Sequence, residues 1–181
     1  NKTSICVLLD NSGSMHGNPL ENSKKVIKYF VQNVLGSKDY FSLITFNSEA
    51  VVVINKMMIE DNIEYILTQI SLIQANSCTN IPDAISTGLT LMNDDLEGYT
   101  KNILLFTDGV NTVGPRDCAE IMSNLNSINP DWSKTSINCC GLGKEVDLET
   151  LNMISKESES KIMVIEKTSD IIPDLSLDTN A

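Results

Sequence analysis

Oxygen-bearing side chains follow two apolar runs of this 181-residue chain, at the points where the runs stop. The run "SICVLL" ends at Asp10, and Ser12 and Ser14 follow at alternate positions. The run "NILLFT" ends in the same way at Asp108. Carboxylate and hydroxyl oxygens, without sulfur or imidazole, are donors that suit Mg²⁺, Ca²⁺ or Mn²⁺ rather than Zn²⁺ or copper. These residues therefore indicate a site for a hard divalent cation.

The carboxyl ends of neighbouring parallel strands meet at one edge of a sheet, where ligands of open α/β sheets bind. We therefore expect Asp10 and Asp108 to lie close together, and adjacent carboxylates repel each other unless a proton or a cation lies between them. A third loop, "NSCTNIPDAI", adds Thr79 before a predicted helix. With Ser12 and Ser14, these residues supply five oxygen donors, of which three are neutral. Because Mg²⁺ prefers six oxygens, one position would remain for water or for a partner's carboxylate.

Strand-like and helix-like segments alternate along the chain and would position these loops. Apolar or β-branched runs predict strands at 4–10, 39–47, 50–57, 102–109, 134–143 and 161–166. Apolar residues at helical spacing predict helices at 18–36, 59–70, 80–93, 118–128, 147–157 and 169–178. Only Ser48 and Glu49 separate the second and third strands, which indicates an antiparallel hairpin. The pattern predicts a Rossmann-like α/β fold: a doubly wound, mostly parallel sheet of about six strands, with one antiparallel edge strand and flanking helices.

The first predicted helix has a clear start signal. Asn18 is expected as its N-cap, a proline follows, and Glu21 stands where a capping box needs it. The lysines of this helix, Lys24, Lys25 and Lys28, are the nearest approach to a basic patch in the chain. We expect all three on a solvated helix face.

Composition excludes some classes of function. The chain has 13 Lys and Arg against 24 Asp and Glu, a formal net charge of −11, so nucleic-acid binding is not expected while cations are attracted. No apolar run approaches the roughly 20 residues of a membrane span, so no membrane insertion is expected. The five cysteines contain no C-x-x-C pair and are expected as buried thiols, which favours a reducing, intracellular compartment and leaves an extracellular one open.

The motifs of the predicted site resemble those of the von Willebrand factor A domain family. "DNSGSM" is similar to the family's Asp-x-Ser-x-Ser motif, and the threonine of "CTN" and the aspartate of "FTDG" follow in the family's order. The resemblance implies a metal-ion-dependent adhesion site (MIDAS) made of Asp10, Ser12, Ser14, Thr79 and Asp108. Many members have glycines where this chain has serine and cysteine at 77 and 78, which predicts a stiffer or shifted loop before the threonine.

The resemblance covers essentially the whole chain and implies a single domain over residues 1–181. Because the sequence starts with Asn1 rather than Met, we expect this domain to be part of a longer protein. The resemblance implies a binding module and not an enzyme: the metal takes its last ligand from an Asp or Glu of a protein partner, and no bond is broken. We expect a monomeric domain that holds Mg²⁺, with Ca²⁺ or Mn²⁺ as alternatives.

Two other functions stay open at this point. A Mg²⁺-dependent aspartyl phosphotransferase or phosphatase would use Asp10 as its nucleophile. The resemblance to haloacid-dehalogenase-like phosphatases fails, however, at Ser12, where they commonly carry a second aspartate. A scaffold of the same fold would bind its partners independently of metal. A Ser/His/Asp hydrolase is not expected, because the only histidine, His16, lies two residues from Ser14 in a predicted exposed loop.

Overall fold

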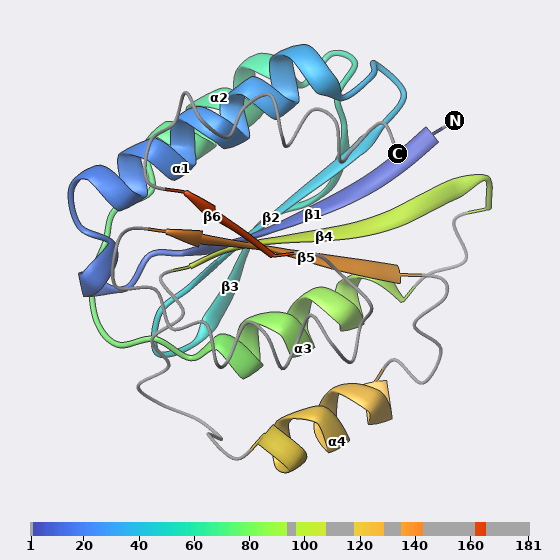
Figure 1. Ribbon diagram of the computed structural model, residues 1–181. Coiled ribbons are helices and arrows are strands. Elements are labelled where there is room, and N and C mark those ends of the chain that lie inside the picture. Colours follow the sequence, from blue (N-terminus) through green and yellow to red (C-terminus); the bar gives the residue numbers. More distant parts are fainter. Residues whose placement is uncertain (1, 94–96, 108–117, 129–134, 143–161, 166–181) are drawn as a thin grey trace.

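The computed structural model describes residues 2–93, 97–107, 118–128, 135–142 and 162–165. Within these residues, six strands form one sheet in the order β3-β2-β1-β4-β5-β6 (Figure 1). The strands are β1 (Lys2–Asp10), β2 (Tyr40–Phe46), β3 (Ala50–Met58), β4 (Tyr99–Thr107), β5 (Thr135–Leu142) and β6 (Ile162–Ile165). All neighbouring pairs are parallel except β2 and β3. The predicted doubly wound, mostly parallel sheet with one antiparallel edge strand is confirmed.

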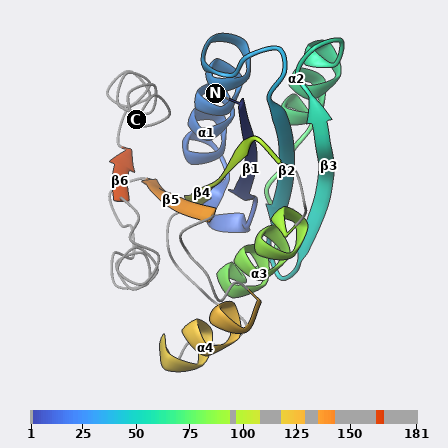
Figure 2. The ribbon, with the colours of Figure 1, turned by 90° about the vertical axis from the view of Figure 1, so that its right-hand side faces the viewer.

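Helices cover both faces of the sheet, with α1 and α2 on one face and α3 and α4 on the other (Figures 1 and 2). They are α1 (Asn18–Tyr29), α2 (Ile63–Ser71), α3 (Ile81–Met92) and α4 (Cys118–Ile128). A 3₁₀ turn, η1 (Gly13–Met15), precedes α1, and a π-helical turn, η2 (Phe30–Val34), extends it. None of the helices in the described ranges has the length and apolar character that a membrane span needs. The helices predicted at 147–157 and 169–178 lie outside the described residues.

The central strand β1 is buried on both faces, which explains its continuous apolar run. Ile5 and Val7 belong to the core that packs against α1 and α2, whereas Cys6 and Leu8 belong to the core on the side of α3 and α4. Successive side chains of a strand point to opposite faces, so the part of β1 that is covered on both sides, Ser4–Asp10, buries every residue. After the apolar run from Ile5 to Leu9, the chain becomes polar where β1 reaches the edge of the sheet, at Asp10.

The order of the strands reverses at β1 and β4. From β1 the chain continues to β2 on one side, and from β4 it continues to β5 on the other. The two strands are adjacent and parallel, with Leu9 opposite Phe106. Their carboxyl ends, Asp10 and Thr107, therefore lie at the switch point, outside which open α/β sheets bind their ligands.

The edge strand β3 is irregular. Its register against β2 shifts between Phe41 and Leu43 and again between Leu43 and Ile44. Near the first shift, Lys56 has a φ of 42°, and its backbone N–H donates to the Ser42 hydroxyl at 2.9 Å. Such bulges bend a strand and increase its twist. The predicted hairpin is thus confirmed, but its second strand departs from a regular ladder.

Two expectations for the first helix are wrong. The helix begins at Asn18, so its N-cap is the preceding Gly17, at φ 86°, which offers no side chain to accept a hydrogen bond. Glu21 is paired with Lys24, its Oε1 lying 3.4 Å from Nζ. Lys25 is exposed, but Lys24 is buried beside the end of α2. The expectation that all three lysines lie on a solvated helix face is therefore wrong for Lys24.

Candidate metal centre

Asp10 lies at the end of β1 and has no exposed surface. Each of its carboxylate oxygens accepts a hydrogen bond: the Ser12 backbone N–H donates to Oδ1 at 2.9 Å, and the Thr107 hydroxyl donates to Oδ2 at 2.7 Å. The first bond folds the loop after β1 back onto the strand end. The second ties β1 to β4 across the switch point. The carboxylate is therefore held in one orientation by backbone and side chain together.

Ser12 and Ser14 place their hydroxyl groups side by side. Their Oγ atoms lie 3.1 Å apart, with Ser12 buried and Ser14 exposed. Neighbouring ligands of an octahedral Mg²⁺ at 2.0–2.1 Å are separated by about 2.9 Å. The measured separation is close to that value, so the two hydroxyl oxygens fit adjacent positions on one small cation. The turn η1, which contains Ser14, produces the short separation.

Backbone hydrogen bonds join this loop to the loop that carries Thr79. The Gly13 N–H donates to the Ser77 carbonyl at 2.9 Å, and the Asn76 N–H donates to the Asn11 carbonyl at 2.8 Å. Thr79 itself is buried. The structure therefore brings Asp10, Ser12 and Ser14 together and fastens the loop of Thr79 against them.

The loop before Thr79 has the backbone shape that glycines would allow. Ser77 has a φ of 67°, in the left-handed region that glycine enters most easily. Its carbonyl nevertheless makes the bond to Gly13, so the loop is fixed in spite of the substitution. Asn80, and not Thr79, caps α3: its side-chain oxygen accepts from the Asp83 N–H at 3.1 Å. A capping role for Thr79 is therefore unnecessary.

Asp108, the fifth predicted site residue, lies outside the described residues. In the sequence it directly follows Thr107, the residue whose hydroxyl binds Asp10. Across the described ranges, no three or more His, Cys, Asp or Glu side chains are grouped so that they could hold a metal. What the described residues offer is one carboxylate with three hydroxyl groups on adjoining loops. This is an all-oxygen donor set of the kind that hard cations take.

Sequence reasoning missed two residues that shape the site. Thr107 anchors the Asp10 carboxylate. The only feature of the sequence that could have identified it is that it is a small polar residue at the end of an apolar strand. Asn11 joins three segments: its N–H donates to the Phe46 carbonyl at 3.0 Å, its carbonyl accepts from Asn76, and its side-chain Nδ2 donates to the Gln74 carbonyl at 3.2 Å. Its Oδ1 is buried without a hydrogen-bond partner. No spacing rule in the sequence marks such a residue.

Two neighbours of the site take different positions. Met15 has no exposed surface and belongs to the core under α1 and α2. His16 is exposed, as expected for a loop histidine. Met15 thus anchors the loop from below and leaves the histidine on the rim.

Among the cysteines whose side chains the structure describes, Cys6, Cys78 and Cys139 are free thiols. Cys6 and Cys139 are buried, and burial raises the pKa of each thiol to about 12, opposed at Cys6 by the nearby charge of Lys56. Cys78 is exposed beside Thr79, which contradicts the expectation that all cysteines are buried. The core thiols therefore act as small apolar groups.

Comparisons with known proteins agree with this fold. The family model for the von Willebrand factor type A domain matches residues 4–176 of the chain. The inter-alpha-trypsin inhibitor heavy chain H3 of Bos taurus is 26% identical over 175 residues, which cover 92% of this chain and 19% of that protein. The chain spans between 18% and 39% of the length of the curated relatives that it matches.

Solved structures show the same architecture. A von Willebrand factor type A protein from Catenulispora acidiphila has a TM-score of 0.83 at 16% identity, covering 99% of this chain and 42% of that chain. Proximal thread matrix protein 1 from the mussel byssus, solved with a zinc-occupied MIDAS motif, has a TM-score of 0.75 at 22% identity, covering 99% of this chain and 46% of that chain. At these identities the likeness establishes the fold.

Proposed function

Because the chain belongs to the von Willebrand factor type A domain family, we propose that it is a divalent-metal-dependent protein-binding module. The metal would lie at the carboxyl edge of the sheet and take an Asp or Glu side chain from a protein partner. The observation that carries this proposal is the anchored Asp10 carboxylate with the Ser12 and Ser14 oxygens 3.1 Å apart beside it.

Five residues would hold the metal: Asp10, Ser12, Ser14, Thr79 and Asp108. The serine and threonine hydroxyls are neutral, so the formal charge of the ion would be balanced only by the two aspartates. An ion bound in this way supplies an electrophilic position that a further carboxylate can fill. Mg²⁺ is the ion that we propose, with Ca²⁺ or Mn²⁺ as alternatives, because every donor is an oxygen.

Similarity to a zinc-occupied motif also supports a divalent metal at this place. The mussel byssus protein holds zinc in its MIDAS motif and shares the fold of this chain. The described donor set here contains hydroxyls and a carboxylate, which are ligands that zinc accepts less readily than sulfur or imidazole. We therefore include Zn²⁺ in the test below.

The residue at position 12 argues against the phosphotransferase alternative. Haloacid-dehalogenase-like phosphatases commonly carry a second aspartate there, whereas this chain has Ser12, whose hydroxyl is hydrogen-bonded to that of Ser14. We therefore propose a non-catalytic role. The phosphotransferase hypothesis predicts metal-dependent release of phosphate from a panel of phosphoesters, abolished by Asp10→Asn; turnover of that kind would replace the present proposal.

Calorimetric titration with Mg²⁺, Mn²⁺ and Zn²⁺ tests the metal site. We expect saturable binding of Mg²⁺ to the wild type and its loss in Asp10→Asn. Ser14→Ala removes an exposed hydroxyl at little risk to the fold and should weaken binding at least severalfold. Glu64→Ala, which removes an exposed carboxylate from α2, is the matched control. Equal heats for the wild type and Asp10→Asn would overturn the metal site.

Capture of a protein partner in Mg²⁺ and in EDTA separates the proposal from the scaffold alternative. A metal-dependent module loses its partner in EDTA and binds it more weakly in Ser14→Ala. A scaffold of the same fold keeps its partner under both conditions. Retention in EDTA would therefore contradict the role of the metal while leaving the fold assignment unaffected.

A further inference from the structure

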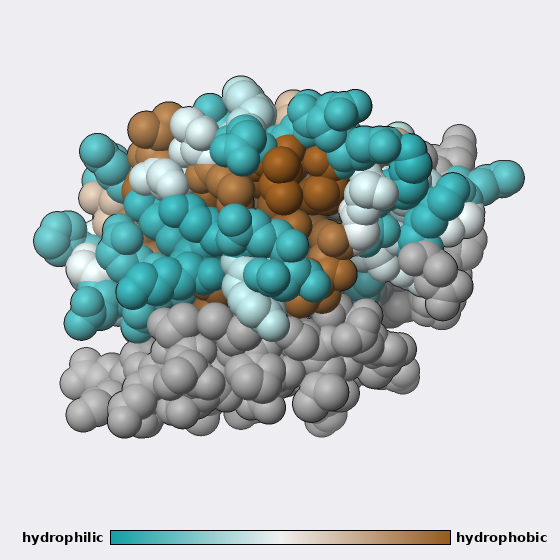
Figure 3. All heavy atoms as spheres, turned by 90° about the horizontal axis from the view of Figure 1, so that it is seen from above, coloured by the Kyte–Doolittle hydropathy of each residue, from teal (hydrophilic) through white to brown (hydrophobic). Residues whose placement is uncertain are grey.

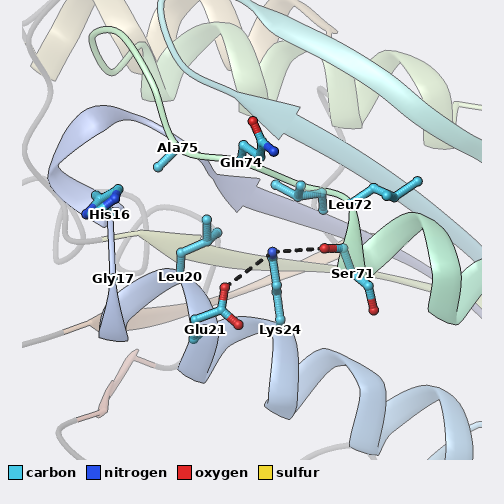
Figure 4. A pocket seen from close by; sticks show the side chains of 10 residues that line it. His16, Gly17, Leu20, Glu21, Lys24, Ser71, Leu72, Gln74 and Ala75 are labelled. Atoms are coloured by element: carbon cyan, nitrogen blue, oxygen red, sulfur yellow. Dashed lines mark hydrogen bonds and ion pairs between the residues drawn. The ribbon is translucent and has the colours of Figure 1, made fainter.

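A pocket of about 580 Å³ lies next to the candidate metal centre, between the start of α1 and the segment that follows α2 (Figure 4). His16 and Gly17, which continue the loop of Ser12 and Ser14, form one side of it. Gln74 lies on the other side, and its carbonyl accepts the side-chain hydrogen bond of Asn11. The pocket and the candidate metal centre therefore share their loops.

The walls of the pocket combine apolar side chains with one ammonium group. Leu72, which is 66% exposed although it is a large aliphatic residue, and the half-buried Ala75 contribute most of the open apolar surface, and the buried Leu20 and Ile73 lie beneath them. Viewed from the side of α1 and α2, apolar surface lies open among hydrophilic side chains (Figure 3). An exposed leucine in a concave site is a contact that a partner side chain can cover.

Lys24 supplies the ammonium group, which lies close to Leu20 and Leu72 in the view of the pocket (Figure 4). Its side chain is only 9% exposed, and Nζ donates to the Ser71 carbonyl at 3.2 Å and to Glu21 at 3.4 Å. An ammonium group has three N–H donors, so these two bonds leave one for a ligand. A cation with little access to water binds an anion more strongly than a solvated one does.

Glu21 offsets only part of this charge. Its side chain is 60% exposed and its contact with Nζ is long, so water screens the glutamate far more than the lysine. The N-terminus of α1 adds to the positive potential, because Gly17 as N-cap has no side chain to accept from the first-turn N–H groups. The pocket thus offers a lysine that is less accessible to water than its glutamate partner, on a chain with a formal net charge of −11.

We propose that this pocket binds a second part of the same protein partner, an acidic segment that carries an apolar residue. In this arrangement one carboxylate of the segment occupies the metal, a second carboxylate pairs with Lys24, and the apolar side chain packs on Leu20 and Leu72. The inference rests on the proposed metal-dependent function and adds the chemistry that selects the partner. It gives the buried lysine a role beyond its hydrogen bond to the end of α2.

Selection from random dodecapeptides displayed on phage tests the inference, with the immobilised wild-type domain in Mg²⁺ as bait. We expect the enriched sequences to share two acidic positions at constant spacing and one large apolar position. One enriched peptide is then synthesised, and its affinity is measured for the wild type and for variants. Lys24→Met should weaken binding about tenfold or more, because a charge-assisted bond is lost. Leu72→Ser should also weaken it.

Two controls separate recognition from a structural role of the lysine. Lys25→Met makes the same change of charge on the exposed side of α1 and should alter affinity less than about twofold. Glu21→Gln removes the carboxylate that competes for Nζ and should strengthen binding roughly two- to fivefold. If Lys24 only stabilised the fold, Lys24→Met would not weaken peptide binding while Glu21→Gln strengthened it.

The outcomes distinguish the two proposals. Metal-dependent enrichment with a single acidic position, or equal affinity of Lys24→Met and the wild type, overturns the pocket and leaves the proposed function. Enrichment that persists in EDTA and in Asp10→Asn but is lost in Lys24→Met supports acidic recognition in the pocket and overturns the metal. Absence of any enriched sequence overturns both.

Discussion

The orientation of a single carboxylate depends on a hydroxyl group from the neighbouring strand. Thr107 donates to Asp10 at 2.7 Å, and both residues are fully buried. A buried carboxylate oxygen that loses a donor keeps the cost of its desolvation. Partners of metal ligands commonly contribute ten- to hundredfold to metal affinity, because they fix the orientation of the ligand.

Thr107→Val keeps the shape of the side chain and removes this hydroxyl. We expect it to lower the free energy of unfolding by about 1–3 kcal/mol and to weaken Mg²⁺ binding by roughly ten- to hundredfold. Urea titration and calorimetry measure the two effects. Thr45→Val, at a buried position of β2, is the control. An unchanged affinity for Mg²⁺ in Thr107→Val would contradict the role of the hydroxyl.

The two buried thiols make stability depend on pH in the alkaline range. In the folded chain the pKa of Cys6 and that of Cys139 are about 12, whereas an unfolded cysteine titrates near 8.5. Above that lower pKa the native state binds more protons than the unfolded state, so stability falls as pH rises. Between pH 8 and 10 the loss should be about 2 kcal/mol per thiol.

Urea titrations at pH 8, 9 and 10 measure this loss. Cys139→Ala should reduce the slope of stability against pH, even though the substitution also costs packing at every pH. Ile137→Val costs packing in the same core without removing a thiol and should leave the slope as it is in the wild type. A slope that is the same in Cys139→Ala and the wild type would show that this thiol does not titrate on unfolding.

At the scale of elements, the close approach of α3 to the sheet depends on a glycine. A Cβ at Gly88 would lie 3.1 Å from Leu8 Cδ2 and 3.6 Å from Ile103 Cδ1. Both neighbours are fully buried and have little room to move. A larger residue here would push α3 away from β1 and β4.

Gly88→Val is therefore expected to destabilise the fold by about 2–3 kcal/mol, through overpacking that outweighs the unfavourable helix propensity of glycine. The change in the midpoint of urea unfolding measures it. Thr90→Val, on the exposed side of the same helix, should stay within about 0.5 kcal/mol of the wild type. Equal stabilities of the two variants would mean that the contact relaxes without cost.

The order and type of the elements could be predicted because each has a local signal. The apolar run before Asp10 indicates a strand buried on both faces, and the short gap at 48–49 indicates the hairpin; both are confirmed. The burial of Lys24 could not be predicted, since it depends on the end of α2, 47 residues away. The same holds for Thr107, whose partner is 97 residues away.

The candidate site could be predicted as a set of residue types rather than as a geometry. Alternation along the sequence places Ser12 and Ser14 near each other, but their 3.1 Å separation results from η1. The hydrogen bond from Gly13 to Ser77 joins two loops that are far apart in sequence, and no local pattern encodes it. Contacts between loops that are distant in sequence could therefore not be predicted and are seen only in the folded structure.

At the scale of the whole molecule, the proposed metal binding would be linked to folding. A ligand that binds only the native state stabilises it, by about 2.7 kcal/mol at a concentration 100 times its dissociation constant. For a chain of 181 residues this corresponds to a rise in melting temperature of roughly 5–10 °C. The net charge of −11 also favours any cation nonspecifically, so the control must separate the two effects.

Thermal unfolding in Mg²⁺ and in NaCl of equal ionic strength makes this separation. We expect the wild type to melt higher in Mg²⁺ than in NaCl, and Asp10→Asn to melt at one temperature in both. A rise of the same size in Asp10→Asn would mean that Mg²⁺ acts by screening surface charge.

The irregular edge strand also affects the tendency of the molecule to associate with other copies of itself. A free strand edge can recruit a strand of another chain, and an unbroken ladder of uncharged residues is the most hazardous kind. On β3, the two bulges and the positive φ of Lys56 break the edge into short stretches and place a charge among them. The exposed valines Val51 and Val52 therefore lie on a stretch too short to seed a continuous intermolecular sheet.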